Sequence, residues 1–139
     1  MTRKHTSATD AETPINVVLV TLDNHVNGAI ARAEKRLTHD LTGIDFTSFA
    51  ATEWEADPQS LSDCRAAIAK GDIVIVTMLF MEPHIKAISD ALAARRDDCD
   101  AMVCCMSAPE VMQYTRMGRF TMDAEPSGPI ALLKRLRGT

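Results

Sequence analysis

Aromatic rings, basic clusters and long apolar runs are scarce in this chain of 139 residues, and each scarcity excludes a class of protein. Aromatic residues make up 4% of the sequence, too few for a row of rings that stack on bases. The net charge is −4, whereas phosphate binding needs a concentrated basic face. No segment approaches the roughly 18 consecutive apolar residues of a membrane-spanning helix. A nucleic-acid-binding protein and a transmembrane protein are therefore not expected.

Cysteine and glycine are also sparse, and neither occurs in a metal or phosphate motif. The four cysteines include no CxxC pair, so a structural zinc site has little support. Neither GxGxxG nor GxxxxGK[ST] occurs, which argues against nucleotide binding through those loops. Residues 1–13 are polar and lack the apolar core of a signal peptide. We expect them to be a disordered lead-in, and the protein to be cytoplasmic with its cysteines as thiols.

The remaining sequence alternates strand-like and helix-like segments. Four segments have the β-branched or alternating pattern of strands, namely 15–21, 44–50, 72–80 and 101–106. Five segments have apolar residues at helical spacing or helix-start signals, namely 27–41, 58–70, 82–96, 109–117 and 129–136. Residues 119–128 are predicted to form a loop. This order predicts one α/β domain over residues 14–139.

Capping residues support these boundaries. Asp57 followed by Pro58 is typical of a helix start, and Ser107 with Glu110 has the spacing of a capping box. Strands joined by helices imply right-handed crossovers and a parallel sheet. We therefore predict a three-layer, flavodoxin-like or Rossmann-like fold with four mostly parallel strands in the order 2-1-3-4 and helices on both faces. Such domains often have a fifth strand, so we expect an N-terminal module of a longer chain.

A candidate ligand edge follows from this strand order, because open parallel sheets bind ligands at the carboxyl ends of their strands. Five polar residues fall there, after the first and third strands: Asp23, His25, Thr77, Glu82 and His84. Carboxylates and imidazoles also suit divalent metals, but such residues collect at loop ends because they cap helices and close turns. No metal site is assigned, and no nucleophile arrangement of the Ser-His-Asp or Cys-His type is evident from the spacing.

The segment from Asp23 to Gly28 has an Asp-x-His-x-x-Gly pattern similar to that of cobalamin-binding domains. In such a pattern the carboxylate orients the imidazole, which leaves its second nitrogen for a metal. Those domains also need small residues after later strands, where this chain has bulky ones such as Met78 and Phe80. Methionines near this edge could line a tetrapyrrole, form an adaptable protein interface or fill core gaps, and Trp54 could cover this domain or contact another. For the methionines and for Trp54 alike, the sequence leaves these alternatives open.

Longer stretches of the sequence resemble one family. The stretches are VVLVTLDNHVNGAIARAEKRL, DIVIVTMLFMEPHIKAI, DDCDAMVCCMSAPEVMQYTRMGRF and GPIALLKRLRG. They are similar to the N-terminal region of the large, porphyrin-binding subunits of magnesium chelatases of (bacterio)chlorophyll synthesis, which are related to the large subunits of aerobic cobalt chelatases. The match runs from about residue 15 to the end of the chain.

The resemblance implies that the whole subunit binds protoporphyrin IX and receives magnesium, while two ATPase-type partner subunits use ATP to drive insertion. The catalytic part of such subunits lies downstream, so no catalytic residue is transferred to this chain. We expect a fragment without a cofactor of its own that assists assembly or porphyrin access in a ligase that forms nitrogen–metal bonds. The alternatives are a tetrapyrrole- or corrinoid-binding module that uses His25 and an α/β interaction domain without a ligand.

Overall fold

A computed structural model of the chain describes residues 14–122 and residue 136. The predicted lead-in at 1–13 and, apart from Leu136, the predicted helix at 129–136 lie outside the described residues. The elements in order are β1 (Ile15–Thr21), η1 (Asn24–Val26), α1 (Asn27–Asp40), β2 (Ile44–Ala50), η2 (Ala51–Glu53), α2 (Pro58–Lys70), β3 (Ile73–Thr77), α3 (Glu82–Arg95), β4 (Ala101–Cys105), α4 (Pro109–Met112), β5 (Arg116–Met117) and β6 (Phe120–Thr121).

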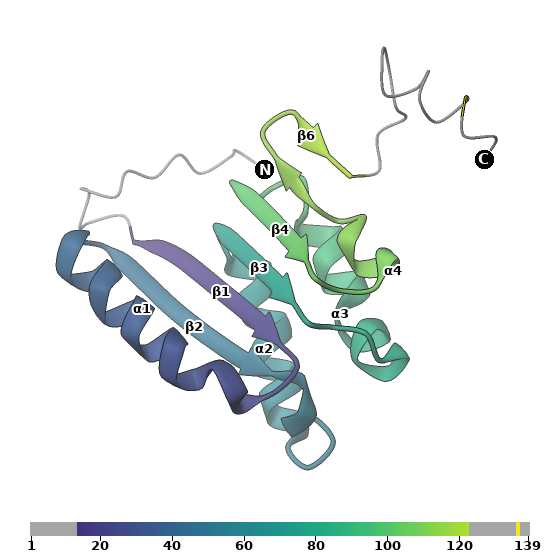
Figure 1. Cartoon of the computed structure of the whole chain (residues 1–139), viewed down its shortest axis with the longest axis horizontal. Coiled ribbons are helices and arrows are strands. Elements are labelled where there is room, and N and C mark those ends of the chain that lie inside the picture. Colours follow the sequence, from purple (N-terminus) through teal and green to yellow (C-terminus); the bar gives the residue numbers. More distant parts are fainter. Residues whose placement is uncertain (1–13, 123–135, 137–139) are drawn as a thin grey trace.

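The sheet has the order β2-β1-β3-β4-β5-β6 (Figure 1). The first four strands are parallel and follow the predicted order 2-1-3-4. The prediction of four strands is wrong, because β5 and β6 add an antiparallel hairpin beyond β4. Strands of two residues show almost no alternation of polar and apolar side chains. For this reason the sequence pattern predicted a loop at residues 119–128 and a helix before Gly118. Gly118 has φ +61 and makes the turn of this hairpin.

Helix boundaries follow the capping signals at most positions. The Asp57 carboxylate accepts hydrogen bonds from the backbone N–H groups of Gln59 and Ser60, which starts α2 as predicted. The capping box is wrong: α4 starts after Ala108, and the Ser107 hydroxyl instead accepts a hydrogen bond from the Leu79 N–H. Ser107 is therefore used to join the ends of β3 and β4, and α4 is a single turn.

The hydrophobic core lies on one face of the sheet, under α2 and α3. Side chains that point to this face from the three central strands are almost completely buried, namely Val18, Val20, Val74, Val76, Met102 and Cys104. Ile68 of α2 and Leu92 of α3 are fully buried against them. Trp54 is 6% exposed and belongs to the same cluster. Of the two alternatives for Trp54, the structure therefore supports the one in which it covers its own domain.

Helix α1 lies on the opposite face, where it contacts β2 (Figure 1). None of its residues is buried. Its apolar stripe, which includes Ile30 and Leu37, is half-buried. Helices therefore lie on both faces of the sheet as predicted, but their coverage is unequal. One face carries the core, while the other is only partly covered within residues 14–122.

Candidate functional site

The Asp23–His25 pair forms as the sequence pattern indicates. The Asp23 carboxylate caps η1 by accepting a hydrogen bond from the His25 backbone N–H at 3.0 Å. Its second oxygen lies 2.8 Å from Nδ1 of the His25 ring. Because Nδ1 is engaged, Nε2 is the ring atom left for a ligand, and the His25 side chain is 88% exposed.

Hydrogen bonds lower the pKa of the Asp23 carboxyl below its ordinary value. The hydrogen bond from the backbone N–H of His25 is the largest cause, desolvation acts in the opposite direction, and the hydrogen bond and charge of the His25 ring lower the pKa further. The carboxylate therefore stays charged and can hold the imidazole in one orientation. A shallow depression of about 420 Å³ opens beside this pair, and its other lining residues are Asn24 and Thr52. The depression is open to solvent and suits a ligand held at its edge.

The remaining predicted site residues do not join this pair. Glu82 is exposed and makes an ion pair of 2.7 Å with Lys86, which lowers the pKa of the glutamate by hydrogen bonding and by charge. His84 packs edge-on against Trp54 with ring centroids 6.0 Å apart. Thr77 is half-buried and is the register partner of Cys105. Among the described residues no three His, Cys, Asp or Glu side chains are placed to hold a metal ion.

His84 and Trp54 share a feature that the sequence does not reveal. Nδ1 of His84 and Nε1 of Trp54 are buried, and neither has a hydrogen-bond partner in the structure. Buried polar atoms normally have such a partner, and an ordered water is the usual one where protein atoms supply none. Nδ1 of His84 therefore faces the interior, where the ring packs against Trp54.

An exposed apolar rim is the second component of the carboxyl edge. We use the name methionine rim for Met78, Phe80, Met81 and Met106, which are between 38% and 68% exposed. Met78 directly follows β3 and has φ +63, and Met106 directly follows β4 and has φ +47. The left-handed region costs a residue with a side chain roughly 1–2 kcal/mol. The sequence indicates methionines at this edge, but the strained backbone that exposes two of them is a tertiary feature.

The backbone around these two methionines is tied together. The N–H of Met78 donates to the carbonyl of Met106 at 3.0 Å, and the N–H of Ala108 donates to the carbonyl of Leu79 at 2.9 Å. Leu79, between the rim residues Met78 and Phe80, is fully buried in the core. The pairing of β3 with β4 thus continues past both strand ends and fixes the two methionine side chains on the outside.

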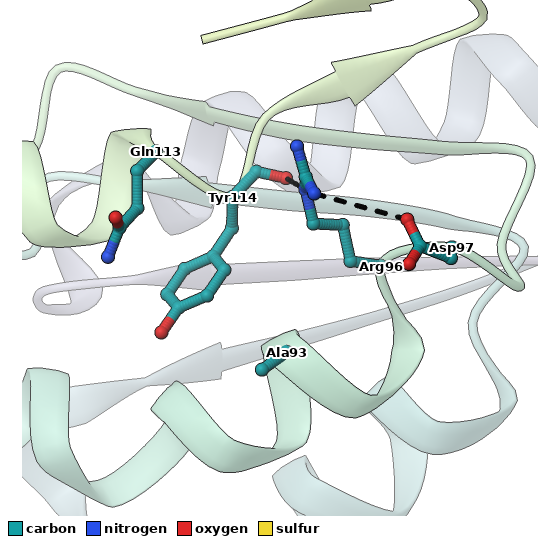
Figure 2. A pocket seen from close by; sticks show the side chains of 5 residues that line it. All are labelled: Ala93, Arg96, Asp97, Gln113 and Tyr114. Carbon is teal, nitrogen blue, oxygen red and sulfur yellow. Dashed lines mark hydrogen bonds and ion pairs between the residues drawn. The ribbon is translucent and has the colours of Figure 1, made fainter. Parts of the chain in front are cut away.

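A second cavity lies away from this edge, between the end of α3 and the segment after α4 (Figure 2). It has a volume of about 330 Å³, and Arg96, Asp97 and Tyr114 are among its lining residues. Nε of Arg96 donates to the Tyr114 carbonyl at 3.2 Å, and an Arg96 nitrogen lies 4.0 Å from an Asp97 oxygen. Arg96 therefore holds two segments together. From the sequence, Arg96 is recognisable only as a basic residue at the end of a helix, and that position does not predict a cavity.

The fold and the site together define a class: an α/β domain with an open sheet, in which the Asp23–His25 pair and an exposed apolar rim lie at the carboxyl ends of parallel strands. A family model described as a domain of unknown function, DUF3479, matches residues 16–139, and the chain belongs to this family. Among the described residues no helix is long and apolar enough to cross a membrane.

Three curated relatives are magnesium-chelatase subunits. The chain is 42% identical over 123 residues to the H-type magnesium-chelatase subunit of Rhodobacter capsulatus and 43% identical to that of Cereibacter sphaeroides. Each alignment covers 88% of this chain and 10% of the relative. The chloroplastic magnesium-chelatase protein ChlH of Oryza sativa subsp. indica is 26% identical over 112 residues, which is 78% of this chain and 8% of that protein. The resemblance to the N-terminal region of these subunits is thus confirmed, and the chain spans about a tenth of their length.

Proposed function

We propose that this chain forms the N-terminal domain of a magnesium-chelatase large subunit and assists its assembly or the access of porphyrin, without catalytic groups of its own. The observation that carries the proposal is the identity of 42–43% to two bacterial subunits named for magnesium chelatase. The whole subunit binds protoporphyrin IX in this proposal and receives magnesium for (bacterio)chlorophyll synthesis in the cytoplasm. ATP is used by separate ATPase-type partner subunits.

The methionine rim is the surface that we assign to this role. Exposed apolar groups that gather at one edge are typical of interaction sites, and methionine adapts to irregular partner surfaces. The rim residues Met81 and Met106 are 57% and 68% exposed. A contact there with the remainder of the large subunit would remove this apolar surface from water. The domain would then have a structural role, because its contact with the remainder of the subunit would hold the porphyrin entrance in a defined arrangement.

The test is a complementation assay. A large subunit from which the region matching this chain has been deleted is combined with the ATPase-type partners, protoporphyrin, magnesium and ATP. Addition of the separate chain is expected to restore formation of magnesium protoporphyrin. The double variant Met81→Asp/Met106→Asp should lose this rescue. Met117→Asp is the matched control, because Met117 is 43% exposed but pairs with the first residue of β4, at the opposite end of that strand. Equal rescue by both variants would remove the rim from the proposal, and formation of product by the chain alone would refute it.

A second candidate function is supported by the geometry at His25. An exposed imidazole whose Nδ1 is held 2.8 Å from a carboxylate can offer Nε2 to the metal of a tetrapyrrole or corrinoid. In this alternative the domain is a binding module that takes its ligand at the carboxyl edge. The apolar rim would then contact the macrocycle, because thioether side chains pack well against flat rings.

Titration of the purified chain separates the two candidates. Deuteroporphyrin, protoporphyrin, magnesium protoporphyrin and cobalamin are added, and the absorption spectrum is followed. Binding through His25 predicts a saturable spectral shift that His25→Ala abolishes. His39→Ala is the control, because His39 is 86% exposed and its Nδ1 lies 3.0 Å from an Asp40 oxygen, so it reproduces the same local pair elsewhere. A shift that persists in His25→Ala, or no shift at all, contradicts the second candidate.

A further inference from the structure

Basic side chains line the exposed side of α1. Arg32, Lys35, Arg36 and His39 are spaced i, i+3, i+4 and i+7, so they share one face of the helix, and all four are exposed. A depression of about 420 Å³ opens along this face, lined by these four side chains and Asp40. Because Nδ1 of His39 lies 3.0 Å from an Asp40 oxygen, His39 differs from the other three. We use the name basic stripe for Arg32, Lys35 and Arg36.

The three cations of the basic stripe have no counter-charge within the part of the chain that the structure describes. No carboxylate of residues 14–122 forms an ion pair with any of them. Asp40 has a suitable spacing, four residues after Arg36, but its carboxylate lies against His39 instead. On α3 the same spacing does produce an ion pair, since Lys86 lies 2.7 Å from Glu82. The charge of the basic stripe is therefore not neutralised by its own helix.

The charge of the basic stripe is also local. The whole chain has a net charge of −4, so the stripe is a positive patch on an acidic protein. Arg32 and Arg36 are four residues apart, and like charges at this spacing destabilise a helix. A partner of opposite charge would relieve that repulsion and would be steered toward the patch during association.

The basic stripe lies away from the methionine rim. Helix α1 begins beyond the carboxyl end of β1 and ends before the amino end of β2, so it runs back along the strands (Figure 1). The loop after α1 lies at the amino end of β1, where the Ile15 N–H donates to the Gly43 carbonyl at 2.6 Å. The methionine rim follows the carboxyl ends of β3 and β4. A flat partner surface that covers the rim therefore does not also cover the basic stripe, which needs a second partner.

The surroundings of the basic stripe favour an acidic protein surface over a membrane or a nucleic acid. Helices that lie on bilayers insert apolar side chains beside their basic ones. The apolar residues Ile30 and Leu37 of α1 are half-buried on the side that contacts β2, so they are not available for insertion. Nucleic acids need a broader basic face than three side chains on an acidic chain provide.

We propose that the basic stripe is a docking surface for an acidic face of a separate protein subunit. The inference rests on the proposed function, because it assigns that acidic face to one of the ATPase-type partner subunits. The guanidinium groups of Arg32 and Arg36 can each donate two parallel hydrogen bonds to a carboxylate, and Lys35 adds a third charge between them. The domain thus contacts the remainder of the large subunit at one end and an ATPase-type partner along α1.

The test is a calorimetric titration of the full 139-residue chain with each ATPase-type partner separately. Saturable binding to one of them is expected, and Arg32→Glu/Arg36→Glu should weaken it by about tenfold or more. Lys70→Glu/Arg119→Glu is the matched control, because it makes the same change in net charge at two exposed positions outside α1. The control should retain the affinity of the unsubstituted chain, and circular dichroism shows whether both variants keep their helices.

Salt and lipid vesicles complete the titration. Binding should weaken between about 0.1 M and about 1 M NaCl, because the screening length falls from about 10 Å to about 3 Å. Vesicles of phosphatidylserine and phosphatidylcholine should not sediment the chain. The proposal is overturned if neither ATPase-type partner binds, if the two double variants bind equally well, or if the vesicles sediment the chain through the basic stripe.

The complementation assay separates this inference from the proposed function. When the unsubstituted chain restores product formation, Arg32→Glu/Arg36→Glu should raise by about tenfold the concentration of ATPase-type partner that gives half the maximal rate, and leave the maximal rate unchanged. If that concentration is the same for both double variants, the docking surface is refuted and the proposed function stands. If the unsubstituted chain gives no rescue yet binds the partner through the basic stripe, the proposed function fails and the docking surface stands.

Discussion

At the scale of single residues, the clearest departure from sequence expectation is the backbone at Met78 and Met106. Both residues have positive φ, which their side chains disfavour, and both follow strands that pair with each other. The hydrogen bond from the Met78 N–H to the Met106 carbonyl couples the two conformations. Strain of this kind persists only where the surroundings impose it, and it concentrates at functional edges.

Replacing Met106 by glycine should relieve this strain. Met106 is 68% exposed, so little burial is lost, while the left-handed penalty of roughly 1–2 kcal/mol disappears. The flexibility of glycine in the unfolded chain offsets about 0.5–1 kcal/mol of that gain. We expect Met106→Gly to raise the free energy of unfolding by up to about 1.5 kcal/mol in urea denaturation.

Met81→Gly is the comparison for this prediction. Met81 has a similar exposure of 57% but an ordinary φ of −86, so only the entropic cost of glycine applies. We expect Met81→Gly to lower the free energy of unfolding by about 0.5–1 kcal/mol. A destabilisation of the same size in Met106→Gly would show that the left-handed conformation at residue 106 carries no strain.

At the scale of elements, the four parallel strands and three longer helices were predictable, because each has at least five residues and a clear apolar period. The Asp57–Pro58 start of α2 and its end before Gly71 were also readable from local chemistry. The hairpin of β5 and β6 was not, because its strands have two residues each and are defined by the strand they pair with. Ser107 was misassigned for the same reason: its hydrogen-bond partner, Leu79, is 28 residues away.

Thr115 joins the hairpin to the sheet and offers a test at this scale. Its hydroxyl donates to the Cys104 carbonyl at 2.9 Å and accepts from the Cys104 N–H at 3.0 Å, and the residue is 3% exposed. Thr115→Val removes both bonds and leaves two buried backbone groups without these partners. We expect a loss of about 1–3 kcal/mol in the free energy of unfolding, measured in urea.

Thr47→Val is the matched control, because Thr47 lies on β2 with its side chain exposed. Exposed substitutions of this kind usually change stability by less than about 0.5 kcal/mol. If Thr115→Val lowers the free energy of unfolding no more than Thr47→Val does, the hydroxyl of Thr115 does not hold the hairpin against β4.

At the scale of the whole molecule, the buried thiols of the core make the free energy of unfolding depend on pH. Burial raises the pKa of the Cys64 and Cys104 thiols from an ordinary 9.0 to about 12. In the unfolded chain these thiols ionise near pH 9, whereas in the folded chain they stay neutral up to about pH 12. The contribution of these buried thiols to the free energy of unfolding is therefore fully present below pH 9 and is lost as the pH rises from 9 to 12.

Urea unfolding between pH 8 and pH 11 measures this loss. Each buried thiol is expected to lower the free energy of unfolding by about 1 kcal/mol per pH unit above pH 9. Cys104→Ala should show a shallower decline with pH, whatever its stability at pH 8. Thr47→Val should keep the original slope, because Thr47 is exposed and its hydroxyl does not ionise in this range. Equal slopes in the two variants would mean that burial of Cys104 does not suppress its ionisation.

The site shows the same division between local and tertiary information. Asp23 and His25 were predictable as a pair because they lie two positions apart in the sequence and the carboxylate caps the helix turn that carries the imidazole. The expectation that Glu82 and His84 share that edge rested only on strand order. In the structure Glu82 pairs with Lys86, one helical turn along α3, and His84 packs on Trp54.

The sequence by itself determined the parallel strand order, the main helices, the family and the Asp23–His25 pair, because each depends on local pattern or on neighbours a few residues apart. Only the tertiary structure decided the hairpin at the edge of the sheet, the left-handed methionines and the unequal cover of the two sheet faces. These features depend on which strands lie side by side and on the side to which each crossover passes. Their energies arise from contacts between segments far apart in the chain, which a local pattern does not encode.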